Sequence, residues 1–130
     1  MMEKKEIKFR GKTIEELKAL EVREFATHLK SKQRRILLRN FQEIEKFVGR
    51  MKNKISKNKN IKTHLRDMII VPDMVGMKVQ VYNGNSYVAF EIVTEMLGHK
   101  LGEFSPTRKR IQHGSAGVGA TKGSKHKSKK

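Results

Sequence analysis

The sequence predicts an α+β protein: a small antiparallel sheet built on a hairpin, packed with N-terminal helices, with a disordered basic C-terminal tail. Three observations support this class. Apolar residues recur at steps of three and four through much of the first 60 residues, which is the period of a helical stripe. Asn83-Gly84 then joins two apolar runs, and this pair is a strong hairpin signal. The last 26 residues are rich in Gly, Ser and Lys, a composition typical of disorder.

Charge is distributed unevenly along the chain. The 130 residues carry 30 Lys+Arg and 13 Asp+Glu, a formal net charge of +17. Residues 1–60 hold 18 basic and 8 acidic side chains, residues 61–104 hold 4 and 5, and residues 105–130 hold 8 and none. We therefore expect a helical basic arm (1–60), a compact α+β body (61–104) and a basic tail (105–130). Such an excess of positive charge indicates a polyanionic partner.

Composition excludes several classes of function. The chain has no Cys, which excludes disulfides, thiolate metal sites, thiol catalysis and Fe–S clusters. No apolar run approaches the roughly 20 residues of a membrane span, and the first 12 residues lack the apolar core of a signal peptide. The five His have no metal-like spacing. We expect no cofactor, no metal and no membrane partner.

The arm is predicted to begin with a short helix from about Ile14 to Leu20. Thr13 and Glu16 have the spacing of a capping box at its start. Another turn or two of helix is expected across residues 22–29.

A longer helix is predicted from Ser31, as its N-cap, to about Asn53. Asn40 is a candidate interruption of this helix, and residues 53–60 read as a polar linker. The stripe that supports the helix consists of Ile36, Leu37, Phe41, Ile44, Phe47, Val48 and Met51.

The body is predicted to contain a strand at Met68–Val71, ended by Pro72, and then a hairpin. A two-residue type I′ loop at Asn83-Gly84 would pair Val79 with Val88 and place both on one apolar face. Forty-four residues are near the lower limit for a lone domain, so the sheet is expected to lean on the helices, on RNA, or on both.

The end of the body is predicted from two signals. Thr94 is expected to cap a turn of helix that Gly98 stops, and residues 98–104 are expected to return as an extended segment.

Clustered arginines are the strongest candidates for binding. Arg34, Arg35 and Arg39 lie within about two helical turns, and guanidinium groups bind phosphates bidentately. The few aromatic residues look mostly buried, which disfavours base stacking on a sheet. These patterns favour structured RNA recognised through its shape and backbone.

The histidines are weak candidates for catalysis. His99 and Glu103 are four residues apart, but Gly98 and Gly102 argue against a helix that would bring them together. Asp67 is expected to pair with a neighbouring Arg or cap a turn rather than act as a base.

One segment of the body resembles a known family. Asn83-Gly84-Asn85, followed by Leu97-Gly98-His99-Lys100-Leu101-Gly102-Glu103-Phe104-Ser105-Pro106-Thr107-Arg108, resembles the signature of the ribosomal S-nineteen family. Ile70 to Gly76 is similar to that family's I-F-P-x-M-I-G turn. The segments Ser31–Arg35 and Gly114–Thr121 resemble its archaeal and eukaryotic branch, whose eukaryotic members are called S-fifteen.

The resemblance implies a structural constituent of the small ribosomal subunit, without enzymatic activity, in the cytoplasm. It implies binding to the 3′ major domain of small-subunit rRNA in the subunit head, beside the S-thirteen protein and near the contact with the large subunit. The tail would reach toward tRNA in the decoding region.

The residues expected to contact RNA combine the charge pattern with this resemblance. The rRNA-binding set is Arg34, Arg35, Arg39, Lys62, Arg66, Lys78, His99, Lys100, Thr107, Arg108, Lys109, Arg110 and His113. The tail residues expected near tRNA are Lys122, Lys125, Lys127, Lys129 and Lys130.

Two other classes of function stay open at this point. One is a non-ribosomal basic nucleic-acid-binding protein, such as a chromatin protein or RNA chaperone. The other is a small enzyme that acts on RNA through His99 or His64.

Overall fold

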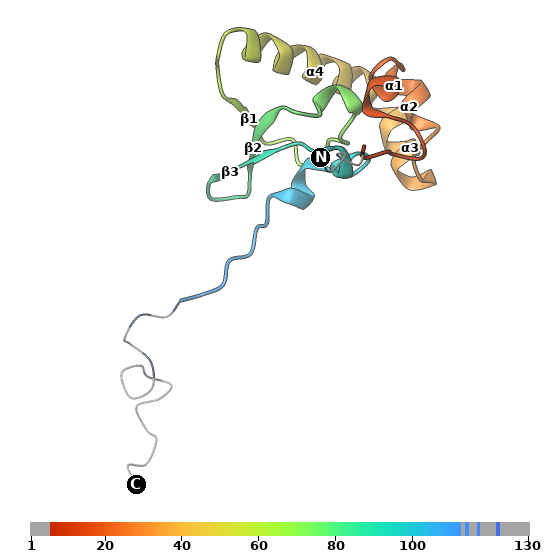
Figure 1. Cartoon of the computed structure of the whole chain (residues 1–130). Coiled ribbons are helices and arrows are strands. Elements are labelled where there is room, and N and C mark those ends of the chain that lie inside the picture. Colours follow the sequence, from red (N-terminus) through yellow and green to blue (C-terminus); the bar gives the residue numbers. More distant parts are fainter. Residues whose placement is uncertain (1–5, 113, 115–116, 118–121, 123–130) are drawn as a thin grey trace, which may run out of the picture.

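The structure is a computed structural model that describes residues 6–112, 114, 117 and 122. Its helices are α1 (Ile14–Lys18), α2 (Val22–Ala26), α3 (Ser31–Arg39) and α4 (Phe41–Ser56), and its strands are β1 (Ile61–Thr63), β2 (Lys78–Tyr82) and β3 (Tyr87–Glu91). Short 3₁₀ helices follow as η1 (Pro72–Met74), η2 (Thr94–Met96) and η3 (Leu101–Phe104). Figure 1 shows α1, α2 and α3 gathered at one end of the molecule, with α4 running from them toward the sheet. The predicted α+β class is confirmed.

The first two helices form where the sequence predicts them. Thr13 Oγ1 accepts from the Glu16 N–H at 3.4 Å, and Glu16 Oε2 accepts from the Thr13 N–H at 3.0 Å, so the capping box is present. The turn expected across residues 22–29 is α2. A second capping box, made by Glu21 and Glu24, starts α2.

The predicted long helix is divided at Asn40. The backbone there has φ −114° and ψ 17°, which ends α3 and lets α4 begin in a new direction. The N-cap of α3 is Lys30 rather than Ser31, because Lys30 is extended and its carbonyl already accepts from the Arg34 N–H. The expected polar linker is also shorter than predicted, because α4 continues through Ser56 and a turn with Asn58 at φ 53° follows.

The sheet is mixed rather than antiparallel. Its order is β1-β2-β3, and β1 pairs parallel with β2, with Ile61 opposite Val79. A parallel pair needs a crossover connection, and the segment from His64 to Met77, which contains η1, provides it.

The hairpin has the predicted faces but a different register. Val81 pairs with Val88 and Val79 with Phe90, a shift of two residues from the prediction. The loop has four residues because Asn83 Oδ1 accepts from the N–H groups of Asn85 and Ser86, at 3.0 and 2.8 Å. Only Gly84 has positive φ in this loop, at 100°, so the turn is not type I′. A shift of two leaves every side chain on its face.

Two extended segments predicted in the body are corrected. Met68–Val71 makes a single bridge, Ile69 to Lys100, and is not a ladder strand. Residues 98–104 are not extended throughout, because the chain coils into η3 after Lys100.

The predicted cap at Thr94 is also one residue out of place. Thr94 is the first residue of η2 and Val93 is its N-cap, because Val93 is the last extended residue. Gly98 follows η2 with φ 80°, as a residue that stops a helical turn does.

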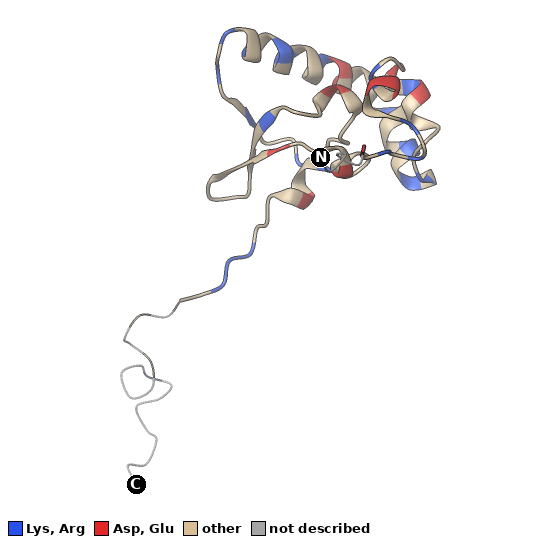
Figure 2. Ribbon diagram, in the orientation of Figure 1, with Lys and Arg blue, Asp and Glu red and all other residues tan. Residues whose placement is uncertain are grey.

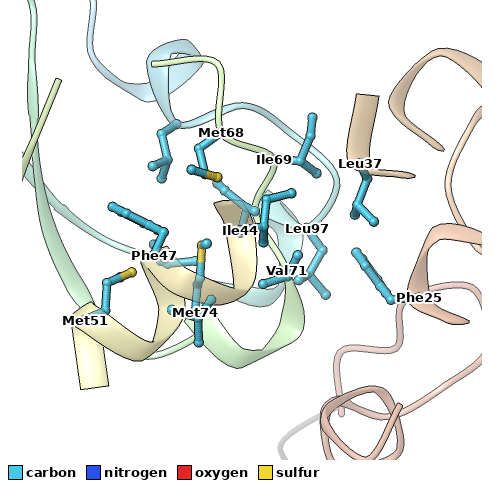
Figure 3. Close-up of a cluster of buried hydrophobic side chains, with 14 of the residues drawn as sticks. Phe25, Leu37, Ile44, Phe47, Met51, Met68, Ile69, Val71, Met74 and Leu97 are labelled. Atoms are coloured by element: carbon cyan, nitrogen blue, oxygen red, sulfur yellow. The ribbon is translucent and has the colours of Figure 1, made fainter. Parts of the chain in front are cut away.

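Arm and body share one hydrophobic core. α4 buries Ile44, Phe47, Val48 and Met51, which are three and four residues apart. Figure 3 shows Phe25 and Leu37 from the arm in the same cluster as Ile69, Val71, Met74 and Leu97 from the body. The sheet therefore packs on the helices, as the small size of the body predicts.

Candidate nucleic-acid interface

Arg34, one of the predicted phosphate ligands, is exposed but hydrogen-bonds to the protein's own backbone. Its Nε donates to the Ala26 carbonyl at 3.1 Å, and its Nη2 donates to the carbonyls of Thr27 and Leu29 at 3.2 and 3.1 Å. Ala26 is the last residue of α2, and Thr27 and Leu29 come just after it, where the carbonyls of a helix end have acceptor capacity left over. Arg34 thus holds α3 against the end of α2.

Arg66 has a similar role in the body. Its Nη1 donates to the Tyr82 carbonyl at 2.7 Å, and its Nη2 donates to the carbonyls of Gly102 and Ser105 at 2.9 and 2.8 Å. One guanidinium thereby joins the end of β2 to η3 and to the residue after it. A Cβ at Gly102 would lie 2.9 Å from the Arg66 Cβ, so glycine is needed for this close approach.

The other predicted α3 arginines differ from Arg34 in making no such hydrogen bonds. Arg35 and Arg39 are exposed and line a shallow hollow on α3 together with Lys32. Neither arginine has a hydrogen bond or ion pair to a described residue. Their guanidinium groups are available to an anion.

A second cationic hollow lies between α4 and β1. Arg50 and Lys54 line it from α4, and Lys62 lines it from β1. Lys62 belongs to the predicted RNA-binding set, whereas Arg50 and Lys54 do not. The signal that could have found them is their spacing, because Lys46, Arg50 and Lys54 recur every four residues.

Few cations are paired with carboxylates. Within the described part of the chain, the ion pairs of Lys or Arg are Lys52 with Asp73 at 3.7 Å and Lys100 with Asp67 at 3.8 Å. Asp67 pairs with Lys100 rather than with the neighbouring Arg that was predicted. Figure 2 shows Lys and Arg on α3, on α4 and on the segment that leaves η3. The excess positive charge is therefore presented on the surface.

The start of the tail is fixed to the sheet. Ser105 is buried and its Oγ donates to the Val81 carbonyl at 3.0 Å, while Asn83 Nδ2 reaches the Pro106 carbonyl at 3.5 Å. The next residues, Thr107, Arg108, Lys109 and Arg110, are exposed. We call residues 106–110 the tail root. Lys122 is exposed, and His113, Lys125, Lys127, Lys129 and Lys130 lie outside the described residues.

His99 and Glu103 meet, although no α-helix spans the two residues. His99 Nδ1 lies 2.7 Å from Glu103 Oε2, because η3 brings the two side chains together without a continuous α-helix. Both side chains are 48% exposed. Lys78, another residue of the predicted RNA-binding set, is exposed on β2.

The expectation that the aromatic residues are mostly buried holds for the phenylalanines but not for Tyr87. Tyr82 is half-buried and Tyr87 is 37% exposed. His64 is exposed beside them, with its ring centroid 4.4 Å from that of Tyr82. The six phenylalanines are buried or half-buried.

The described residues contain no group of three or more His, Asp or Glu side chains that could hold a metal ion. None of their helices has the length and apolar content needed to cross a membrane.

Fold and surface define a class: a small α+β protein whose unpaired cations suit a polyanion. Comparison with known proteins specifies the family. Residues 30–113 match the family described as Ribosomal protein S19. The chain is also 46% identical over 122 residues to the small ribosomal subunit protein uS19 of Methanococcoides burtonii, covering 94% of this chain and 88% of that one. It is 48% identical over 124 residues to the uS19 of Methanocella arvoryzae, covering 95% and 86%. The chain belongs to the ribosomal protein S19 family.

Proposed function

We propose that this protein is a structural constituent of the small ribosomal subunit that binds small-subunit rRNA through its phosphates. The observation that carries the proposal is the similarity to small-subunit uS19 proteins over at least 94% of the chain. The unpaired cations on α3, α4 and the tail root support it, since a protein with a net charge of +17 needs an anionic partner. Its compartment would be the cytoplasm, where ribosomes act.

The finer placement follows from the family resemblance. The protein would bind the 3′ major domain of the rRNA in the subunit head, beside the S-thirteen protein and near the contact with the large subunit. Its role would be non-catalytic. The exposed Arg108, Lys109 and Arg110 support rRNA contact at the tail root, from which the tail would extend toward tRNA in the decoding region.

Co-sedimentation of a tagged chain in gradients of a source-organism lysate tests the assignment. The protein is expected in the small-subunit and ribosome fractions, with crosslinks to rRNA from α3, α4 and the tail root. Equal binding to any duplex, with no tagged protein in those fractions, would contradict the proposal and favour a non-ribosomal nucleic-acid-binding protein.

A second experiment tests the tail. Deletion after His113 is expected to leave assembly into subunits largely intact and to reduce crosslinks to tRNA in tRNA-loaded ribosomes. Crosslinks from Lys122 to rRNA alone, in every tRNA state, would contradict the tRNA contact.

A further inference from the structure

The sheet presents a group of three rings on the face opposite the core. Ile61, Thr63, Val79 and Val81 are buried on one face. Tyr82 and Tyr87 lie on the other face and are directly opposite each other in the β2–β3 ladder. His64 follows Thr63, the partner of Val81, so it lies beside Tyr82. We call His64, Tyr82 and Tyr87 the aromatic platform.

The platform is held in place by polar contacts. His64 Nε2 and the Tyr87 hydroxyl are 2.8 Å apart, and the Tyr82 hydroxyl donates to the Gly84 carbonyl at 3.1 Å. Ring centroids are 5.2 Å apart for Tyr82 and Tyr87, and 5.5 Å apart for His64 and Tyr87. Because the rings are already ordered, a ligand that stacks on them loses little affinity to ordering.

The core does not use this platform. None of its three rings belongs to the buried cluster or to the partly buried residues packed against it. Grouped aromatic rings at the surface are typical of binding sites, because each has an apolar face and a polar edge.

Cations flank the platform. Lys62 Nζ lies 5.4 Å from the centroid of the Tyr87 ring. The tail root begins at the same end of β2, since Pro106 contacts Asn83 and Ser105 contacts Val81. Arg108, Lys109 and Arg110 follow within four residues of Pro106. The acidic residue on this face, Glu91, lies at the opposite end of β3 and pairs with Lys78 in the ladder.

We propose that the aromatic platform stacks an unpaired RNA base and that Lys62 holds a phosphate of the same strand. A base has a π-face that suits an ordered ring, and the neighbouring phosphates suit the flanking cations. The site would tolerate any base, because stacking uses the π-face rather than hydrogen bonds to the base edge. This inference rests on the proposed rRNA binding and adds a mode of contact other than phosphate recognition.

The composition of the chain provides a direct probe. The sequence contains two Tyr and no Trp, and both tyrosines belong to the platform. Tyrosine fluorescence of the full chain therefore reports on the platform alone. An eight-nucleotide oligouridine is expected to quench most of this emission at saturation, whereas an abasic oligoribose phosphate of the same length is not. The oligouridine should also bind about tenfold more tightly than the abasic strand.

Variants separate stacking from phosphate binding when a fluorescein-labelled oligouridine is followed by anisotropy. Tyr87→Leu is expected to lower affinity about tenfold, whereas Tyr87→Phe should keep most of it, because the ring that stacks remains and only its hydroxyl contact with His64 is lost. His64→Ala, which lies outside the strands, gives a second test without altering the ladder. Lys62→Ala, which removes the proposed phosphate contact, should lower the affinity for both strands alike.

Three results would overturn the platform. The first is unchanged tyrosine emission with oligouridine while small-subunit rRNA still binds, which would leave the proposed function intact. The second is equal quenching by the abasic strand. The third is quenching by a decaproline peptide but not by oligouridine, which would identify a protein partner. If the wild-type chain bound no rRNA at all, both the platform and the proposed function would fall.

Discussion

Arg34 and Arg35 are adjacent in the sequence and differ in what they contact. The Arg34 guanidinium donates to three backbone carbonyls at and just after the end of α2. Arg35 has no partner among the described residues and lines an open hollow. Arg66 and Lys62, in the body, differ in the same way. A basic protein thus uses some cations to satisfy its own backbone and leaves others for an anionic partner. Carbonyls at the ends of helices and strands, where acceptor capacity is left over, decide which cation binds the backbone.

The largest predicted effect is the loss of Arg66. Arg66→Ala removes the donors from three carbonyls at once, and a hydrogen bond to a charged group contributes about 1.5–3 kcal/mol. We expect the free energy of unfolding to fall by about 3 kcal/mol or more, and the melting temperature to fall by at least about 10 °C. The matched control is Lys62→Ala, which should change stability by about 0.5 kcal/mol or less. Equal melting temperatures for the two variants would contradict the structural role of Arg66.

Gly102→Ala tests the close approach of the Gly102 backbone to Arg66. The new Cβ would lie 2.9 Å from the Arg66 Cβ and 3.0 Å from its carbonyl oxygen, so the backbone must shift. We expect a loss of about 1–3 kcal/mol in urea unfolding. Gly49→Ala on α4 is the opposite control, because its Cβ meets nothing within 4 Å and Ala favours a helix by about 0.5–1 kcal/mol. A neutral Gly102→Ala would show that η3 is loosely held.

Gly84→Val tests the hairpin loop. Gly84 has φ 100°, and a β-branched residue resists that conformation, so a loss of about 1–2 kcal/mol is expected in thermal melting. No packing clash contributes, because a Cβ at this position meets nothing within 4 Å. A melting temperature like that of the unchanged protein would contradict the strained turn.

The sequence predicted local features, such as helix caps, better than it predicted which strands pair and in which register. The capping box at the start of α1 depends only on Thr13 and Glu16, which are three residues apart. The break between α3 and α4 coincides with Asn40, a polar residue within an apolar stripe. The parallel position of β1 depends on a crossover through residues 64–77, which no short-range pattern records. The hairpin register was missed because the Asn83 side chain, rather than a two-residue turn, closes the loop.

The sequence predicted which arginines cluster on one helix, but it did not predict which of them binds the protein's own backbone. The cluster of Arg34, Arg35 and Arg39 was correctly placed on a helix. Which arginine binds the backbone depends on carbonyls at the end of α2 that helical spacing on α3 does not describe. The platform of Tyr82, Tyr87 and His64 was missed for a similar reason, since two strands and a loop must assemble before the rings meet.

The central claim is that exposed cations without a partner among the described residues bind rRNA, and that cations bound to the backbone hold the fold. Its most direct test is the salt dependence of small-subunit rRNA binding by Arg35→Ala and Arg34→Ala. We expect Arg35→Ala to melt like the unchanged protein and to reduce the slope of log affinity against log salt by about 0.7–0.9, the loss of one phosphate contact. Arg34→Ala should lower the melting temperature and keep the slope. The opposite pattern, with a lower slope for Arg34→Ala and a lower melting temperature for Arg35→Ala, would contradict the account.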